Sequence, residues 1–272
     1  MNKQFTILIM CTIPFLCDAM ENSSEVINKK VGIFSCQNKR PYQEDRFYHG
    51  IVDGGEWYAV YDGHGVKCGD KISHFLKENL HNYFIQTFGS MHERMLEAFK
   101  KADDDQCVRS YKNAGSTATV VYIKDTIAHF AHVGDSRALL EACGMVAFAT
   151  EDHKPSRCDE KQRIEDAGGI ISYARINGSL GVSRAIGDHK YDKNVVISEP
   201  EYTEVLLVRH NKFLVVASDG LWDVMNNDDV VNVLDRQQAK IQDMNAFAKM
   251  LVDLAIERGS TDNITVMVVD LF

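Results

Sequence analysis

The stretch Glu56-Trp-Tyr-Ala-Val-Tyr-Asp-Gly-His-Gly65 joins an apolar run to a short polar segment. Trp, Tyr and Val favour strands and Asp-Gly favours a turn, so the pattern predicts a strand over residues 56–61 that ends at Asp62. Similar polar segments border apolar runs at residues 40–45, 134–137, 218–223 and 260–264. A single segment of this kind is usually only a turn. Their recurrence predicts a functional site built at strand ends.

The rest of the chain shows blocks of strands and blocks of helices. Further strands are predicted at residues 31–36, 117–123, 126–133, 138–142, 146–149, 204–208, 213–218 and 264–271. Helices are predicted at residues 72–88, 91–99, 159–167, 228–234 and 244–256, the second of them opened by a capping box of Ser90 and Glu93. Residues 204–208 and 213–218 are predicted to pair as a hairpin. Short breaks favour antiparallel pairing, and blocks without strict alternation predict an α+β fold.

Composition restricts the class of protein. The 272 residues are 45% hydrophobic and 25% charged, which is typical of a folded domain. Asp and Glu outnumber Lys and Arg by 39 to 30, so a broad nucleic-acid-binding surface is not expected. From Lys30 onward the sequence has no linker and no internal repeat. We therefore expect a single domain over residues 29–272, preceded by an extension over residues 1–28.

The cysteines and the N-terminus bear on the compartment. Seven scattered cysteines without a CxxC pair argue against structural zinc and a disulfide scaffold, and they favour the cytoplasm. Residues 5–17 form an apolar stretch that is too short to span a bilayer but resembles the core of a signal peptide. The alternatives are secretion after removal of residues 1–19, an apolar extension packed on the domain, and a true start at Met20. No other segment approaches transmembrane length.

Acidic residues at the strand ends predict a cation site. Asp62, Asp219 and Asp262 each lie just beyond or just before an apolar run. Several carboxylates cannot share a pocket as bare anions, so such a site must hold cations or take up protons. Oxygen ligands without Cys or clustered His are typical of Mg²⁺ or Mn²⁺.

The ordered motifs resemble those of the metal-dependent (PPM-type) protein phosphatases, the type 2C serine/threonine phosphatases. The resemblance runs from about residue 30 to residue 272. It rests on Arg40-Pro-Tyr-Gln-Glu-Asp45, Val60-Tyr-Asp-Gly-His-Gly65, Gly115-Ser-Thr-Ala118, His132-Val-Gly-Asp-Ser-Arg137, Asp152-His-Lys-Pro155, Arg163-Ile-Glu-Asp-Ala-Gly-Gly169, Asn177-Gly-Ser-Leu-Gly-Val-Ser-Arg-Ala-Ile-Gly-Asp188, Ser218-Asp-Gly-Leu-Trp-Asp223 and Thr261-Asp-Asn-Ile-Thr265. It implies a four-layer α-β-β-α sandwich of two antiparallel sheets flanked by helices.

The resemblance also implies a metal site. It places Asp62 as the carboxylate that bridges two Mg²⁺ or Mn²⁺ ions, with the carbonyl of Gly63 on one ion and with Asp219 and Asp262 on the other. Positions that hold metal-bound waters correspond to Glu44 and Asp45. Positions associated with a third, weaker metal correspond to Asp135 and Asp223. Two such metals can activate a water for displacement at phosphorus.

The catalytic side chains follow from the same resemblance. Arg40 matches the phosphate-binding arginine, whose guanidinium can hold two phosphate oxygens. His64 matches the proposed general acid, which protonates the leaving serine oxygen. The chain is thus expected to be a monomeric phosphatase acting on phosphoserine and phosphothreonine in phosphoprotein substrates. The alternatives are a catalytically silent phosphatase-like binding protein and another two-metal hydrolase such as a phosphodiesterase.

Other residues are expected to be structural. Asp152, Asp166 and Asp188 are predicted to be caps or turn residues, and Trp222 is predicted to lie in the core. His129 and His132, three apart in a strand, should face opposite sides. Residues 156–191 fall where the family carries a flap beside the active site. Val66 stands where the family usually has a second glycine, so it is expected to crowd the loop that presents His64.

Overall fold

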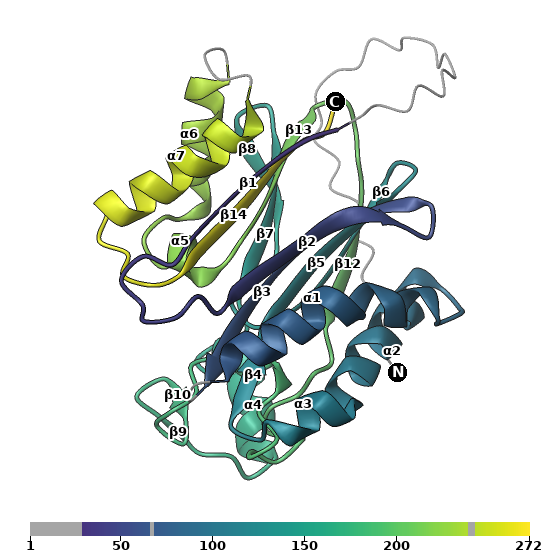
Figure 1. Ribbon diagram of the computed structural model, residues 1–272, viewed down its shortest axis with the longest axis vertical. Helices are drawn as coiled ribbons and strands as arrows, with labels where there is room; N and C mark the ends of the chain where they lie inside the picture. Colours follow the sequence, from purple (N-terminus) through teal and green to yellow (C-terminus); the bar gives the residue numbers. More distant parts are fainter. Residues whose placement is uncertain (1–28, 66–67, 239–242) are drawn as a thin grey trace.

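The computed structural model describes residues 29–65, 68–238 and 243–272. Two antiparallel sheets pack face to face, and helices cover both outer faces, as Figure 1 shows. The predicted α-β-β-α sandwich is therefore confirmed. The extension over residues 1–28 and the effect expected of Val66 both lie outside the described residues. Among the described helices, none combines the length and apolar character that crossing a membrane requires.

The first sheet has five strands and is covered by the C-terminal helices. Its order is β1 (Lys30–Cys36), β14 (Ile264–Asp270), β13 (Asn211–Ala217), β7 (Arg137–Ala142) and β8 (Met145–Ala149). Its outer face carries α5 (Asp219–Trp222), α6 (Asn227–Gln237) and α7 (Met244–Glu257). Trp222 is buried in this layer, and its indole N–H donates to the carbonyl of Ala217 at 2.9 Å. The prediction that Trp222 is a core residue is confirmed.

The second sheet has seven strands and is covered by the helices of the first half. Its order is β11 (Ile186–Gly187), β4 (Ala114–Ser116), β3 (Gly55–Gly65), β5 (Ala118–Lys124), β6 (Ile127–Val133) and β12 (Glu201–Leu206), with β2 (Asp45–Val52) paired to β3. Its outer face carries α1 (Gly69–Ile85), α2 (Met91–Asp104) and α3 (Gln106–Ser110). The capping box of Ser90 and Glu93 is present at the start of α2, as predicted.

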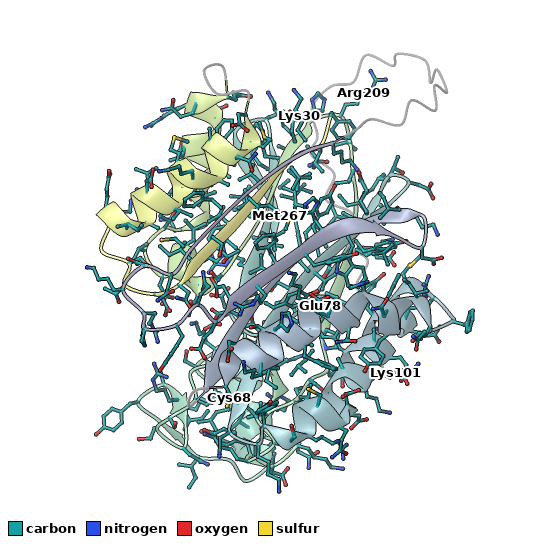
Figure 2. All side chains as sticks on the ribbon, viewed as in Figure 1. Lys30, Cys68, Glu78, Lys101, Arg209 and Met267 are labelled. Atoms are coloured by element: carbon teal, nitrogen blue, oxygen red, sulfur yellow. The ribbon has the colours of Figure 1, made fainter. Side chains whose placement is uncertain are left out.

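The innermost core lies between the two sheets. On β14, Val266 and Val268 face the helices, whereas Met267 and Val269 face the other sheet. Met267 is labelled at this position in Figure 2. Because both faces of β14 are covered, its side chains from Ile264 to Val269 are all buried. This explains why the sequence of the last strand is a nearly continuous apolar run.

Two features of the topology were not predicted. The hairpin expected of residues 204–208 and 213–218 is wrong, because β12 pairs with β6 in one sheet and β13 pairs with β14 and β7 in the other. A short polar break suits a crossing between sheets as well as a hairpin, and strand patterns do not specify partners. Strand β2 has no clear alternation in the sequence, since Arg46, His49 and Gly50 interrupt it.

The region predicted as a flap forms a separate small unit. It contains α4 (Cys158–Asp166) and the two-stranded pair β9 (Ile171–Ser172) and β10 (Arg175–Ile176). A small apolar core that includes Ile164, Ile176 and Val195 holds it together. In Figure 1 this unit lies at the lower end of the sandwich, where β9, β10 and α4 are labelled.

Candidate metal and phosphate site

Carboxylates from both sheets meet at one end of the sandwich. Asp62 near the end of β3 lies directly opposite Asp45 at the start of β2. Asp219 follows β13 and begins α5, and Asp262 lies just before β14, the antiparallel neighbour of β13. The Ser218 hydroxyl joins the two sheets by donating to Oδ2 of Asp45 at 2.8 Å. The predicted clustering of strand-end acids is thus present in the structure.

Two oxygens of this cluster are buried without a partner. Oδ1 of Asp45 and Oδ1 of Asp219 accept no hydrogen bond from the described part of the chain. A buried carboxylate oxygen without a partner is costly, because it has lost its water and gained nothing in return. Such atoms are expected where a protein binds a cation.

Electrostatics support the same interpretation. Burial raises the pKa of Asp62 and of Asp219 well above its ordinary value, and repulsion between neighbouring carboxylates raises both further. Burial also raises the pKa of Asp45 to about 6, although Ser218 donates to its carboxylate. A divalent cation would relieve this repulsion, because it favours the charged form of each acid.

A second group of charges borders the cluster. Asp135, in the loop between β6 and β7, is buried and forms an ion pair with the ammonium of Lys154. Asp223 follows α5, and burial raises its pKa, while the charge of Lys154 acts in the opposite direction. The residues predicted at a third metal therefore share one lysine. Sequence reasoning did not identify Lys154, because only the fold brings it to Asp135.

The loop around Gly63 leaves no room for a side chain. A Cβ at Gly63 would lie 2.2 Å from the carbonyl oxygen of Gly69, and a Cβ at Gly69 would lie 2.5 Å from Oε1 of Glu44. The carbonyl of Glu44 accepts from the amide of Gly63 at 3.2 Å and from the hydroxyl of Ser73 at 2.5 Å. This tight packing places the Gly63 backbone beside Glu44 and Asp62.

The donor set fits Mg²⁺ or Mn²⁺. The clustered ligands are carboxylate and carbonyl oxygens, which these hard cations prefer. The unpartnered oxygen of Asp219 offers a direct ligand, and that of Asp45 offers an acceptor for a metal-bound water. The close approach at Gly63 offers a carbonyl.

Arg40 and His64 lie beside the acidic cluster. The Arg40 guanidinium pairs with Asp262 and remains about half exposed, at 52%. Nε2–H of His64 donates to Oδ2 of Asp188 at 2.5 Å. Burial lowers the pKa of His64, but Asp188 outweighs this effect, so the net pKa is raised. Asp188, predicted only as a cap or turn residue, does occupy a turn, with a positive φ of 54°, but it also contacts His64.

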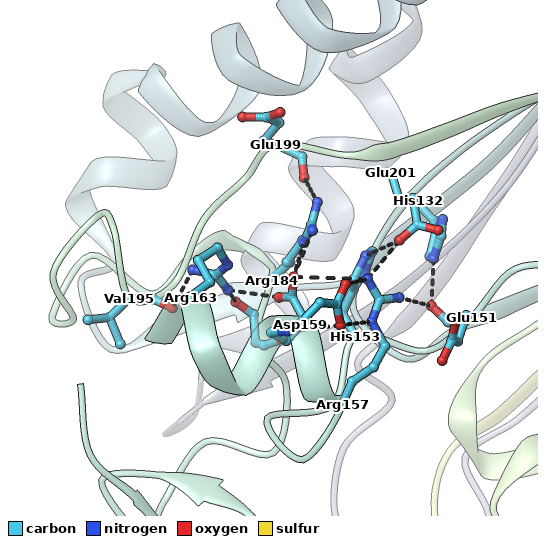
Figure 3. A network of polar contacts seen from close by, with 12 residues as sticks. His132, Glu151, His153, Arg157, Asp159, Arg163, Arg184, Val195, Glu199 and Glu201 are labelled. Atoms are coloured by element: carbon cyan, nitrogen blue, oxygen red, sulfur yellow. Dashed lines mark hydrogen bonds and ion pairs between the residues drawn. The ribbon is translucent and has the colours of Figure 1, made fainter. Parts of the chain in front are cut away.

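A separate polar network lies beneath the flap (Figure 3). His132 and His153 stack with ring centroids 4.4 Å apart. Nε2 of His132 donates to the carbonyl of Glu151 at 2.9 Å, and Nε2 of His153 donates to Glu201 at 3.3 Å. Arg157 also donates to Glu201, at 2.9 Å. His132, His153 and Glu201 are close enough to hold a metal ion. In this structure Nε2 of each histidine and Oε2 of Glu201 instead take part in the hydrogen bonds just described, whereas Nδ1 of His153 has no partner among the described residues.

The two histidines of β6 face opposite sides, as predicted. His132 points to His153 beneath the flap, whereas His129 hydrogen-bonds the hydroxyl of Tyr202 at 2.8 Å. The carboxylate of Asp152 accepts hydrogen bonds from Nε–H and Nη2–H of Arg137, each at 2.9 Å. Sequence reasoning missed the network around His153, because its members come from separate elements.

Comparison with known proteins identifies the fold and the family. Residues 38–264 match the family model of protein phosphatase 2C. Probable protein phosphatase 2C 11 of Arabidopsis thaliana is 40% identical over 88% of this chain, which spans 65% of that relative. Protein phosphatase 1B of Mus musculus is 32% identical over 88% of this chain and 70% of its own length.

Solved structures share the architecture. A serine-threonine phosphatase 2C from Toxoplasma gondii superposes with a TM-score of 0.75 and 23% identity, covering 89% of this chain and 94% of that one. A sex determining protein of C. elegans gives a TM-score of 0.81 and 26% identity, covering 90% and 65%. The motifs, the sandwich and the matched length agree, and the chain belongs to the protein phosphatase 2C family of phosphoprotein hydrolases.

Proposed function

We propose that this chain is a protein serine/threonine phosphatase that depends on Mg²⁺ or Mn²⁺. The observation that carries the proposal is the buried carboxylate cluster, in which Asp45 and Asp219 each keep an oxygen without a partner. Asp62, Asp219, Asp262 and the carbonyl of Gly63 would hold two metals. Glu44 and Asp45 would hold their waters, and Asp135 with Asp223 would hold a third, weaker ion.

Bound metals would supply positive charge and lower the pKa of a water near the phosphorus. Side chains of this protein would bind the phosphoryl group and protonate the leaving oxygen. Arg40 is half exposed beside Asp262, and it can hold two oxygens of a phosphoryl group. His64 can give a proton to the serine or threonine oxygen as its bond to phosphorus breaks, while water supplies the new oxygen of the released phosphate.

The proposal is tested with a phosphoserine peptide, measured with Mn²⁺ and with EDTA. We expect phosphate release only with the metal, and we expect Asp219→Asn to abolish it. Asp166→Asn is the matched control, since it makes the same change at an exposed position of α4. Calorimetry should show weaker Mn²⁺ binding for Asp219→Asn alone. Peptide binding without phosphate release would favour a silent binding protein, and full activity in EDTA would contradict the metal site.

A further inference from the structure

The β-ladder at the edge of the second sheet places Asp188 next to His64. Gly115 of β4 lies directly opposite His64 of β3 on one side and Gly187 of β11 on the other. Asp188 is the residue after Gly187. Its carboxylate therefore reaches across Gly115 to Nε2 of His64, at 2.5 Å.

Gly115 provides the space for this contact. A Cβ at Gly115 would lie 2.4 Å from Oδ2 of Asp188 and 2.8 Å from Nε2 of His64. Real Cβ atoms do not approach other atoms so closely, so any side chain at Gly115 would separate the acid from the histidine. The contact thus needs a residue without a side chain on the strand between them.

The backbone holds Asp188 firmly. Asp188 is 2% exposed; its amide donates to the carbonyl of Ala114 at 2.8 Å, and its carbonyl accepts from Tyr191 at 2.9 Å. Its φ of 54° lies in the left-handed region, which Asp and Asn tolerate better than most residues. On β11, the amide of Gly187 donates to Asp103 of α2 at 2.7 Å. The carboxylate is thus fixed before any substrate binds.

We infer that Asp188 is a positioning residue for His64 and that Gly115 provides the clearance it needs. This inference rests on the proposed function of His64. Because Nε2–H donates to Asp188, Nδ1 is the nitrogen left to serve the substrate. The proton on Nδ1 moves to the serine oxygen as the bond between that oxygen and phosphorus breaks. Asp188 fixes the rotation of the ring and the choice of nitrogen without touching the substrate.

The test compares two leaving groups. A serine oxygen needs a proton to leave, whereas 4-nitrophenolate is stable as an anion and does not. General-acid catalysis is worth ~10²–10⁴-fold. We expect Asp188→Asn, which keeps the shape and tolerates the same φ, to lower kcat on a phosphoserine peptide about 10–100-fold. Its kcat on 4-nitrophenyl phosphate should fall less than about threefold, and KM should change little.

Further variants separate positioning from a general structural role. In a His64→Gln background, Asp188→Asn should cause no further loss on the peptide. Gly115→Ala should reproduce the selective loss by a different change, and Asp166→Asn should match the wild type. Equal losses on both substrates, or additive losses in the double variant, would overturn the inference.

A readout without turnover distinguishes this inference from the proposed function. In the form of His64 that has given up its Nδ1 proton, nitrogen-15 NMR of the imidazole rings should show the remaining proton on Nε2 in the wild type and a mixture of tautomers in Asp188→Asn. If the protein releases no phosphate but this difference is seen, the proposed function fails and the positioning by Asp188 stands. If the spectra of the two proteins agree, the positioning is refuted.

Discussion

Lowering the pH from 7 to 5 should destabilise this protein through one buried histidine. The ring of His153 is fully buried under the flap. Burial lowers its pKa from 6.5 to about 3, although Glu201 accepts its Nε2–H. His132, Arg157 and Arg184 lie close to His153, and their charge disfavours a further proton there. In the unfolded chain the same imidazole has its ordinary pKa.

The sign and size follow from linkage. Between pH 6.5 and 3 the unfolded chain binds more protons at His153 than the folded chain does, so stability falls as the pH falls. At pH 5 the difference amounts to about 2 kcal/mol, since each pKa unit corresponds to about 1.4 kcal/mol. Interactions with His153, His132 and Arg157 overcome burial and lower the pKa of Glu201 to about 2. The stability that ionised Glu201 contributes is lost mainly below pH 4.5, which lies outside the range from pH 7 to pH 5.

Urea unfolding in EDTA at pH 7 and pH 5 measures the effect. Other groups titrate too, and the buried acids act in the opposite direction, so the informative quantity is a difference between proteins. We expect His153→Gln to lose about 2 kcal/mol less than the wild type between the two pH values. His49→Gln, at an exposed position, should behave as the wild type does. If His153→Gln and the wild type lose the same free energy, the buried neutral histidine is not the cause.

Three further outcomes are expected at the site. Asp219→Asn should raise the free energy of unfolding in EDTA by about 1 kcal/mol or more, because it removes one charge from a repelling cluster; a lower value in urea titrations would count against that repulsion. Gly63→Ala should weaken Mn²⁺ binding at least about tenfold in calorimetry, since its Cβ would lie 2.2 Å from the Gly69 carbonyl; unchanged affinity would show that the loop yields. His64→Gln should lower kcat on a phosphoserine peptide ~10²-fold or more and much less on 4-nitrophenyl phosphate; equal losses would exclude general-acid catalysis.

The sequence predicts elements better than it predicts their partners. A nearly continuous apolar run identified the strand that became β14, and the apolar pattern of residues 244–256 identified the helix that became α7, because burial leaves a pattern that residue types reveal. Pairing depends on distant segments, and for this reason the hairpin expected of residues 204–208 and 213–218 was wrong. The four-layer order came from the resemblance to a family and not from periodicity.

In the candidate site, too, features marked by local sequence could be predicted, whereas contacts between distant segments could not. Asp62, Asp219 and Asp262 could be predicted because each stands at a strand end that the sequence marks with a change from apolar to polar residues. Lys154 and the contact of Asp188 with His64 could not, because each depends on a segment packing against a distant loop or strand. Asp188 does follow a short strand, β11, so the same strand-end pattern marks it weakly.

The geometry of the candidate site depends on the packing of the core between the two sheets. Asp45 and Asp62 belong to one sheet, whereas Asp219 and Asp262 follow or precede strands of the other. Between the sheets lies an apolar layer that includes Met267, and the Ser218 hydroxyl connects Asp45 to the strand end that carries Asp219. The spacing of the carboxylates is therefore set by how the two sheets pack. Because packed cores shift when their volume changes, a core substitution far from any carboxylate would alter the affinity for the proposed metals without changing one of the proposed ligands.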